Sequence, residues 1–180
     1  MSDGSTVERF ERTVLVHLDA AYNLARWVTR DAAGAEDAVQ DACLRAFRFF
    51  ESQQGPNAKA WFMTIVRNAC IDWLDAQRRG DGDEPYDDDT HVDGAISVAT
   101  TESPEAAFVR AFEARWVREC IATLPREYRE VLVLRELEEL SYKEIGAIVE
   151  VPVGTVVSRL ARGRALLQER LIEIRRRSRS

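Results

Sequence analysis

Arginine and small polar residues recur with helical spacing near the end of the chain, where they could bind nucleic acid. With 3.6 residues per turn, residues 153–167 place one set of side chains on a single helix face: Val156, Leu160, Gly163 and Leu167. The opposite face carries Thr155, Ser158, Ala161 and Arg162, with Arg159 and Arg164 at its flanks. Guanidinium groups can reach phosphates on both walls of a major groove while the central side chains approach base edges. The pattern predicts a helix that packs on one side and contacts DNA on the other.

The residues before this helix predict the turn that would position it. Ser141 and Glu144 form a capping box, and a short helix follows through Ile148. A break from Glu150 to Pro152 separates this short helix from the arginine-rich one. A short helix, a tight turn and a longer helix are the ingredients of a helix-turn-helix. An arginine-rich amphipathic helix is often only a solvated surface helix, but the three features together favour nucleic-acid contact.

A second group of cations and aromatic side chains lies in the first half of the chain. Its members are Lys59, Trp61, Arg67, Asn68, Trp73, Arg78 and Arg79. Aromatic rings stack on unpaired bases while cations follow the backbone, so the mixture suits single-stranded DNA. Tryptophans at helical spacing are, however, more often core residues, and residue types alone favour that second interpretation.

The chain lacks the residues that most enzymes or metal sites need. Its two histidines, His17 and His91, lie in a predicted helix and in an acidic segment, so no histidine-based triad or metal-ligand spacing is available. The acidic run at 87–89 lacks the alternating ligands of a calcium loop. The three cysteines lie far apart in apolar stretches, which predicts small buried side chains: Cys43, Cys70 and Cys120. We therefore expect no catalytic residue, no metal and no cofactor.

Apolar residues at steps of three and four predict helices throughout. One stripe runs from Phe10 to Val28, a second from Ala35 to Phe50, and a third from Ala58 to about Arg79. The predicted fold class is all-α, with two small helical domains joined by a flexible acidic linker. The expected boundaries are 5–80 for the first domain, 81–102 for the linker and 103–176 for the domain with the helix-turn-helix.

The charge distribution supports this division. The 180 residues are 46% hydrophobic, enough for a core, and carry a net charge of −6, which excludes a uniformly basic nucleic-acid coat protein. Residues 81–112 carry a net charge of −8, whereas residues 151–180 carry a net charge of +6.

The apolar runs are too short for the roughly 18 to 20 residues that span a bilayer, and residues 1–12 lack the order of a signal peptide. We expect a cytoplasmic protein.

Three stretches together resemble the bacterial sigma-70 family of transcription initiation factors, and specifically its smallest branch, the extracytoplasmic-function (ECF) sigma factors. They are Ala35-Glu36-Asp37-Ala38-Val39-Gln40-Asp41 continuing to Arg45-Ala46-Phe47, then Ala60-Trp61-Phe62-Met63-Thr64-Ile65-Val66-Arg67-Asn68, and Pro152-Val153-Gly154-Thr155-Val156-Val157-Ser158-Arg159-Leu160. The resemblance covers nearly the whole chain, and the order and spacing of the motifs agree with the family. It implies a transcription factor that binds core RNA polymerase and directs it to promoters, not an enzyme.

The resemblance also implies roles for individual residues. The second helix would bind the polymerase through Asp37, Gln40, Asp41 and Arg45. The third helix and the loop at 52–57 would open the minus 10 promoter element through Lys59, Trp61, Arg67 and Asn68. The helix-turn-helix would read the minus 35 element through Thr155, Ser158, Arg159 and Arg162. Many members carry Arg or Lys where this chain has Val157, so one expected phosphate or base contact lacks its cation here.

Further partners and two alternative functions follow from the same comparison. The family implies promoter DNA, core RNA polymerase and an anti-sigma factor as partners, and its linker threads through the polymerase, where the acidic segment would resemble a nucleic-acid backbone. One alternative is a sigma-like helix-turn-helix regulator that binds duplex DNA without polymerase. The other is a mimic that only sequesters an anti-sigma factor.

Overall fold

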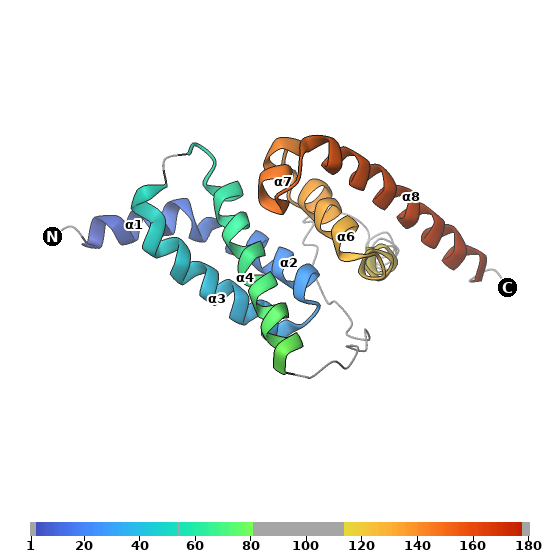
Figure 1. The fold of residues 1–180 in the computed structure, drawn as a ribbon, viewed down its shortest axis with the longest axis horizontal. Coiled ribbons are helices and arrows are strands. Elements are labelled where there is room, and N and C mark those ends of the chain that lie inside the picture. Colours follow the sequence, from blue (N-terminus) through green and yellow to red (C-terminus); the bar gives the residue numbers. More distant parts are fainter. Residues whose placement is uncertain (1–2, 54, 81–113, 178–180) are drawn as a thin grey trace, which may run out of the picture.

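The computed structural model describes residues 3–53, 55–80 and 114–177 of the 180-residue chain. Every regular element in these ranges is helical (Figure 1), which confirms the all-α prediction. The predicted linker at 81–102, with its acidic run and His91, lies outside the described residues. The first residues of the predicted second domain, 103–113, lie outside them as well.

The first half contains four α-helices and two short 3₁₀ turns. They are α1 (Asp3–Thr13), η1 (Leu15–His17), α2 (Leu18–Thr29), α3 (Ala32–Phe49), η2 (Phe50–Ser52) and α4 (Ala58–Gly80). The side chain of Asp31 accepts a hydrogen bond from the Gly34 N–H and caps α3, so this helix begins three residues earlier than its apolar stripe suggests. Asn57 caps α4 in the same way, with its Oδ1 atom accepting from the Ala60 N–H at 3.0 Å.

The first predicted helix is divided in the structure. The apolar stripe predicts one helix from Phe10 to Val28, but η1 separates α1 from α2. The His17 N–H donates to the Val14 carbonyl, three residues back, which tightens the winding to that of a 3₁₀ turn. Phe10, Val14 and Ala21 are nevertheless all buried, so the stripe faces the core on both sides of the break.

The second half contains a helical segment at 114–122 and the predicted helix-turn-helix. Its elements are α6 (Arg126–Leu132), a π-helical turn η3 (Val133–Leu137), α7 (Tyr142–Val149) and α8 (Val153–Arg177). The buried Arg129 donates from Nη1 to the carbonyls of Ala122 and Leu124, at 3.0 and 3.1 Å, and so ties the 114–122 segment to α6.

Helices α2, α3 and α4 pack on one another and form the core of the first half. Helices α3 and α4 approach each other closely at Gly34, where an added Cβ would lie 2.5 Å from the ring of Trp73. Trp73 therefore packs across the start of α3, although Trp73 itself is only half-buried. Trp61 is half-buried against the same core.

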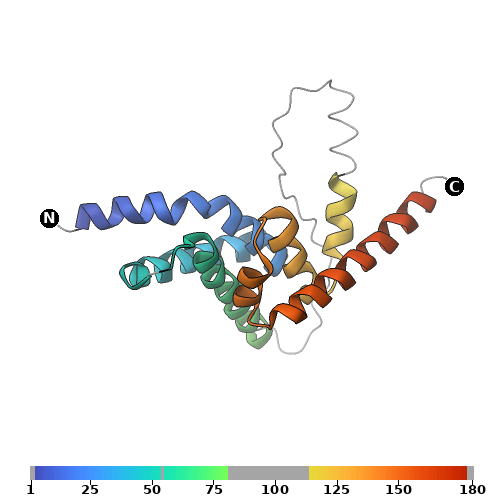
Figure 2. The ribbon, with the colours of Figure 1, turned by 90° about the horizontal axis from the view of Figure 1, so that it is seen from above.

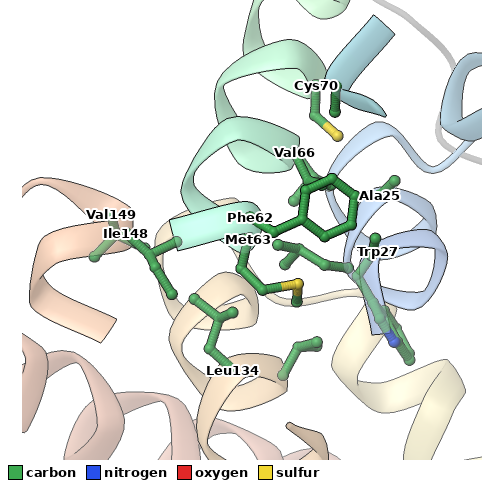
Figure 3. Packing of buried hydrophobic residues seen from close by; sticks show 14 of the residues in the cluster. Ala25, Trp27, Phe62, Met63, Val66, Cys70, Leu134, Ile148 and Val149 are labelled. Carbon is green, nitrogen blue, oxygen red and sulfur yellow. The ribbon is translucent and has the colours of Figure 1, made fainter. Parts of the chain in front are cut away.

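The two halves are also in direct contact. Helix α4 packs against α7, and α2 packs against α6, so one continuous apolar cluster joins them. Figure 3 shows Met63 of α4 beside Leu134, with Ile148 and Val149 of α7 close by. Helices α1 and α8 extend in opposite directions from this shared core (Figure 2).

Candidate nucleic-acid interface

The capping box at the start of α7 is confirmed. The Glu144 N–H donates to Ser141 Oγ at 3.3 Å, and the Ser141 N–H donates to Glu144 Oε2 at 2.7 Å. The hydrogen bond from the Ser141 backbone favours the ionised carboxylate and lowers the pKa of Glu144. The N–H groups of Ser141 and Glu144 both have hydrogen-bond acceptors at the N-terminus of α7, which fixes where this helix begins.

The turn between α7 and α8 depends on two special backbone positions. Glu150 ends α7 in the left-handed region at φ 58°, and the Val151 N–H donates to the Gly146 carbonyl at 3.0 Å. A Cβ on Gly146 would lie 2.9 Å from the Val151 carbonyl oxygen, closer than real Cβ atoms approach. The chain can therefore reverse this tightly over α7 because residue 146 has no side chain.

Helix α8 has the two faces that its spacing predicts. Val156 and Leu160 are 0% and 1% exposed, Gly163 is also buried, and Leu167 is half-buried. On the opposite side Ser158, Ala161 and Arg162 are exposed, while Thr155 and Arg159 are partly exposed. The side of the helix predicted to contact DNA is therefore open within the described part of the chain.

One of the two arginines expected at the flanks of that face is held by the protein itself. Arg164 donates to Glu136 Oε1 from Nη2 at 2.6 Å and from Nε at 3.0 Å. This hydrogen bonding raises the pKa of Arg164, with a smaller effect of a hydrogen bond to Tyr142. Arg164 therefore braces α8 against η3, and a phosphate contact would have to compete with Glu136.

The π-helical turn η3, which carries Glu136, is itself held in place by contacts of Arg135. Arg135 donates to the Leu140 carbonyl at 2.9 Å, and its guanidinium lies 5.1 Å from the centre of the Tyr142 ring. The Leu140 N–H donates to the Leu134 carbonyl at 3.1 Å. These contacts fix the loop that leads into α7, and periodicity in the sequence does not reveal them.

The residues expected to bind the polymerase lie along α3. Asp37 and Gln40 are exposed and Asp41 is partly exposed. Arg45 is paired with Asp41 at 2.7 Å and with Asp72 of α4 at 2.7 Å. The hydrogen bond with Asp72 is the main reason that the pKa of Arg45 is raised. Arg45 therefore links α3 to α4 as well as facing solvent.

Three apolar side chains near the end of α3 are exposed, and the sequence pattern did not single them out. Leu44 is 58% exposed, Phe47 is 45% exposed, and Phe49 is 60% exposed. Leu44 follows Gln40 by four residues and therefore lies one helical turn further along the same face. The signal in the sequence is an apolar side chain at an outward-facing position of an otherwise polar stripe.

The four residues expected at the minus 10 element all lie on α4, but only Lys59 and Arg67 contact the described part of the second half of the chain. Lys59 Nζ lies 3.1 Å from Glu138 Oε2, and Arg67 Nη2 lies 3.3 Å from Glu130 Oε2. Asn57, in the preceding loop, donates to Glu144. Asn68 is half-buried. The structure therefore places both cations against carboxylates, whereas Trp61 and Asn68 lie roughly 180° around the helix from Lys59.

No group of three or more metal-ligating side chains occurs among the described residues. Cys70 and Cys120 are buried as predicted, while Cys43 is only half-buried. Burial raises the pKa of the Cys70 thiol to about 12, so this group stays protonated. None of the described helices is long and apolar enough to cross a membrane.

Comparison with known proteins gives two family matches in the order of the two halves. The model described as Sigma-70 region 2 matches residues 13–80, and the model described as Sigma-70, region 4 matches residues 114–167. The RNA polymerase sigma-H factor of Pseudomonas aeruginosa is 33% identical over 165 residues, which cover 90% of this chain and 86% of the relative. The ECF RNA polymerase sigma factor SigW of Bacillus subtilis is 30% identical over 177 residues, which cover 93% of this chain and 91% of the relative.

Two solved structures resemble the chain over most of its length. One is the sigma factor RpoE in complex with the anti-sigma factor NepR from Bartonella quintana, with a TM-score of 0.72 and 28% identity over 91% of this chain and 97% of that chain. The other is CnrH in complex with the cytosolic domain of CnrY, with a TM-score of 0.60 and 20% identity over 96% of this chain and 90% of that chain. The second similarity concerns the fold alone.

The close approach at Gly146 leads to a prediction about the turn before α8. Replacing glycine by alanine inside a helix usually stabilises it by about 1 kcal/mol. We expect Gly146→Ala instead to lower the free energy of unfolding by about 1 to 3 kcal/mol, because its Cβ would collide with the Val151 carbonyl. Urea denaturation followed by circular dichroism measures this change.

Gly154→Ala is the matched control, since no heavy atom lies within 4 Å of its added Cβ. This variant should be as stable as the parent chain or slightly more stable. If Gly146→Ala behaved like Gly154→Ala, the tight turn described above would be wrong.

Proposed function

Since this chain belongs to the sigma-70 family, as an extracytoplasmic-function (ECF) sigma factor that directs RNA polymerase to promoters, we propose how its surfaces divide that work. Residues 5–80 bind core RNA polymerase and the minus 10 element, and residues 103–176 bind the minus 35 element. Residues 81–102 link the two. The observation that supports this most strongly is the open face of α8, within a complete helix-turn-helix.

The minus 35 element is read by α8. Ser158 and Arg162 are exposed, and Thr155 and Arg159 lie beside them, which is the arrangement that a recognition helix needs in a major groove. Val157 is 46% exposed. At a position where many relatives have a cation, this chain presents an apolar surface, which favours contact with a thymine methyl group over a phosphate.

The minus 10 element is opened by α4 and its preceding loop. Lys59 and Arg67 supply positive charge, Asn68 supplies an amide, and Trp61 supplies an aromatic surface that is only partly buried. Extruding a base from the stack costs a few kcal/mol, which stacking and charged contacts of this kind can offset. Trp61 is half-buried against the core, so it can take part in core packing and still offer an aromatic surface to a base.

Core RNA polymerase is bound by α3. Asp37, Gln40 and Asp41 present acidic and amide groups, which complement a basic partner surface. Arg45 contributes through its ion pairs with Asp41 and Asp72, which fix the position of the face. We add the exposed Leu44, because an apolar side chain among polar ones is typical of an interface core.

The partners follow from the family. RNA polymerase and promoter DNA are the direct ones, and the protein acts in the cytoplasm, where the polymerase works. An anti-sigma factor is a further partner, since the relatives RpoE and CnrH were both solved in complexes, RpoE with its anti-sigma factor. The polymerase performs the catalysis, and this chain supplies promoter choice.

Neither alternative function accounts for both halves. A helix-turn-helix regulator that acts without polymerase gives no role to the sigma region 2 match or to the exposed face of α3. A mimic that only sequesters an anti-sigma factor gives no role to the exposed Ser158 and Arg162 of α8.

Run-off transcription with purified core RNA polymerase and a pool of genomic promoters tests the proposal. Discrete transcripts should appear only when this protein is present, and their start sites define the minus 10 and minus 35 elements. Duplex binding without any polymerase-dependent transcript would favour the regulator instead.

Arg162→Ala tests the role of α8. Promoter recognition should weaken by about 1 to 3 kcal/mol, or roughly fivefold to 150-fold, since one base or phosphate contact is lost. Affinity for core polymerase should not change. Arg115→Ala removes the same charge from the exposed Arg115–Glu119 pair outside the helix-turn-helix and should leave both quantities unchanged. An equal loss of core affinity in Arg162→Ala would contradict the division of labour.

Asp37→Lys tests the role of α3. Reversing this charge should weaken binding to core polymerase about tenfold or more at any promoter, because like charges would then meet in the interface. Glu11 is also an exposed carboxylate, but it lies on α1 and not on α3, so Glu11→Lys is the matched control and should have a much smaller effect. A shift in promoter preference with unchanged core affinity would show that α3 has a different role.

A further inference from the structure

The exposed side of α8 has two unlike edges. Successive residues of a helix lie about 100° apart, and Ser158 lies nearly opposite the buried Val156 and Leu160. Val157 and Val153 lie about 100° and 140° from Ser158 in one direction around the helix. Polar and cationic side chains lie in the other direction: Thr155, Arg159 and Arg162. The open side of α8 is therefore apolar along one edge and cationic along the other.

The apolar edge is a continuous row. Val153 and Val157 are 45% and 46% exposed, and they lie one turn apart, roughly 6 Å along the helix axis. Ala161 follows at the next turn of the same edge and is exposed as well. Single exposed apolar residues are ordinary on protein surfaces. A row of three on the side of a helix-turn-helix that faces away from its own domain is a surface for a partner.

Neither core packing nor helix formation explains valine at these positions. The apolar cluster of the described residues includes Val156 and Leu160 of α8 but neither Val153 nor Val157. Valine also forms helices less readily than alanine or arginine, because its branched side chain loses rotational freedom against the preceding turn. Helix α8 runs along the outside of the second half (Figure 1). The apolar edge therefore fits a group that lies outside this chain.

The cation nearest to this edge is directed elsewhere. Arg164 lies within about 20° of Val157 around the helix, but its guanidinium is bonded to Glu136 at 2.6 and 3.0 Å. Phosphate contacts therefore fall to the opposite edge, where Arg162 is exposed and Arg159 is partly exposed. With the phosphates held along that edge, the valines are turned toward bases and not toward the sugar-phosphate backbone.

The major groove of DNA offers one apolar group at the base edges, the methyl group on C5 of thymine. The same methyl group is present on cytosine that has been methylated at C5. Ser158 and Ala161 are small, and an added Cβ on Gly154 would meet no heavy atom within 4 Å, so the centre of the open side permits close approach to the bases. Valine methyl groups at its edge can then pack on a C5 methyl group.

We propose that Val157, together with Val153, reads pyrimidine C5-methyl groups in the minus 35 element, so that promoter choice depends on thymine methyl groups and responds to methylation of cytosine at the same position. This inference rests on the proposed role of α8 and names the chemical group that this helix selects. A cation at residue 157, as many relatives have, would exchange this contact for attraction to a phosphate.

Deoxyuridine substitution tests the proposal in the intact holoenzyme. The chain is assembled with core RNA polymerase, and each thymine of a minus 35 element identified by run-off transcription is replaced singly by deoxyuridine. Deoxyuridine pairs with adenine as thymine does but lacks the C5 methyl group. At one or two positions the replacement should weaken promoter binding about threefold to tenfold, as expected for the loss of one buried methyl group. Replacement of a thymine in the spacer between the two elements should have no effect.

A second set of promoters separates thymine from methylated cytosine. At the most sensitive position the A·T pair is replaced by a G·C pair, with the cytosine either unmodified or methylated at C5. The methylated promoter should bind at least threefold more tightly than the unmodified one. Equal binding of the two would overturn the response to cytosine methylation.

Val157→Ala connects the methyl group to this side chain. In this variant the deoxyuridine penalty should fall below about twofold, because the two changes remove the same contact. Val153→Ala should reduce the penalty at a neighbouring position. Ile172→Ala is the matched control, since Ile172 is 44% exposed on the same helix but lies roughly 22 Å beyond Val157 along the axis. It should leave every penalty unchanged.

Val157→Arg reverses the chemistry at the same position. Binding of this variant should be insensitive to deoxyuridine, and the slope of log affinity against log salt concentration should become steeper by about one, because one more phosphate is neutralised. A salt slope equal to that of the parent chain, with the deoxyuridine penalty retained, would show that residue 157 does not face the DNA and would overturn the inference.

The outcomes distinguish this inference from the proposed function. If deoxyuridine had no effect at any minus 35 position while Arg162→Ala still weakened promoter recognition, the inference would be overturned and the role of α8 would stand. A penalty that persisted in Val157→Ala would assign the methyl group to another residue and would also overturn it. If Arg162→Ala had no effect either, the proposed role of α8 would fail, and the inference with it.

Discussion

The packing of α4 is the constraint on which the rest of the structure depends. This helix contacts α2 and α3 on one side and α7 on the other, so a single set of side chains belongs to both halves of the core. Phe62, Val66 and Cys70 are buried, and Met63 reaches the second half. Lys59 and Arg67, on the side of α4 that faces the second half, therefore lie at the boundary between the halves.

Charge pairing at that boundary contributes to specificity more than to stability. The free energy of removing Glu130 and Arg67 from water offsets most of the electrostatic attraction between them. A buried pair of this kind therefore adds little net stabilisation. An unpaired Glu130 would, however, be strongly unfavourable in this contact. The pairs therefore select one relative position of the two halves, and the apolar side chains around Met63 supply the attraction.

The sequence predicted the parts of the fold that depend on local pattern. The capping box at Ser141, the two faces of α8 and most of the helices follow from residues within a few turns of each other, and the structure confirms them, although η1 divides the first predicted helix. The pairing of Arg164 with Glu136 and the contacts of Lys59 and Arg67 join residues 28 to 79 positions apart. No periodicity encodes such contacts, because they depend on how finished helices pack. The roles assigned to individual residues at the polymerase and DNA surfaces stay predictions for the same reason.

The contact between the two halves mixes apolar and charged groups. The contact includes carboxylates that regain full hydration on separation, so opening exposes apolar surface but also relieves the desolvation of Glu130 and Glu138. Met63 at its centre is a flexible, polarisable side chain that tolerates changes in its surroundings. A contact made only of branched apolar residues would resemble the inside of a domain and would separate at much greater cost. The mixture of one apolar patch with two ion pairs therefore costs less to separate than a contact of apolar side chains alone.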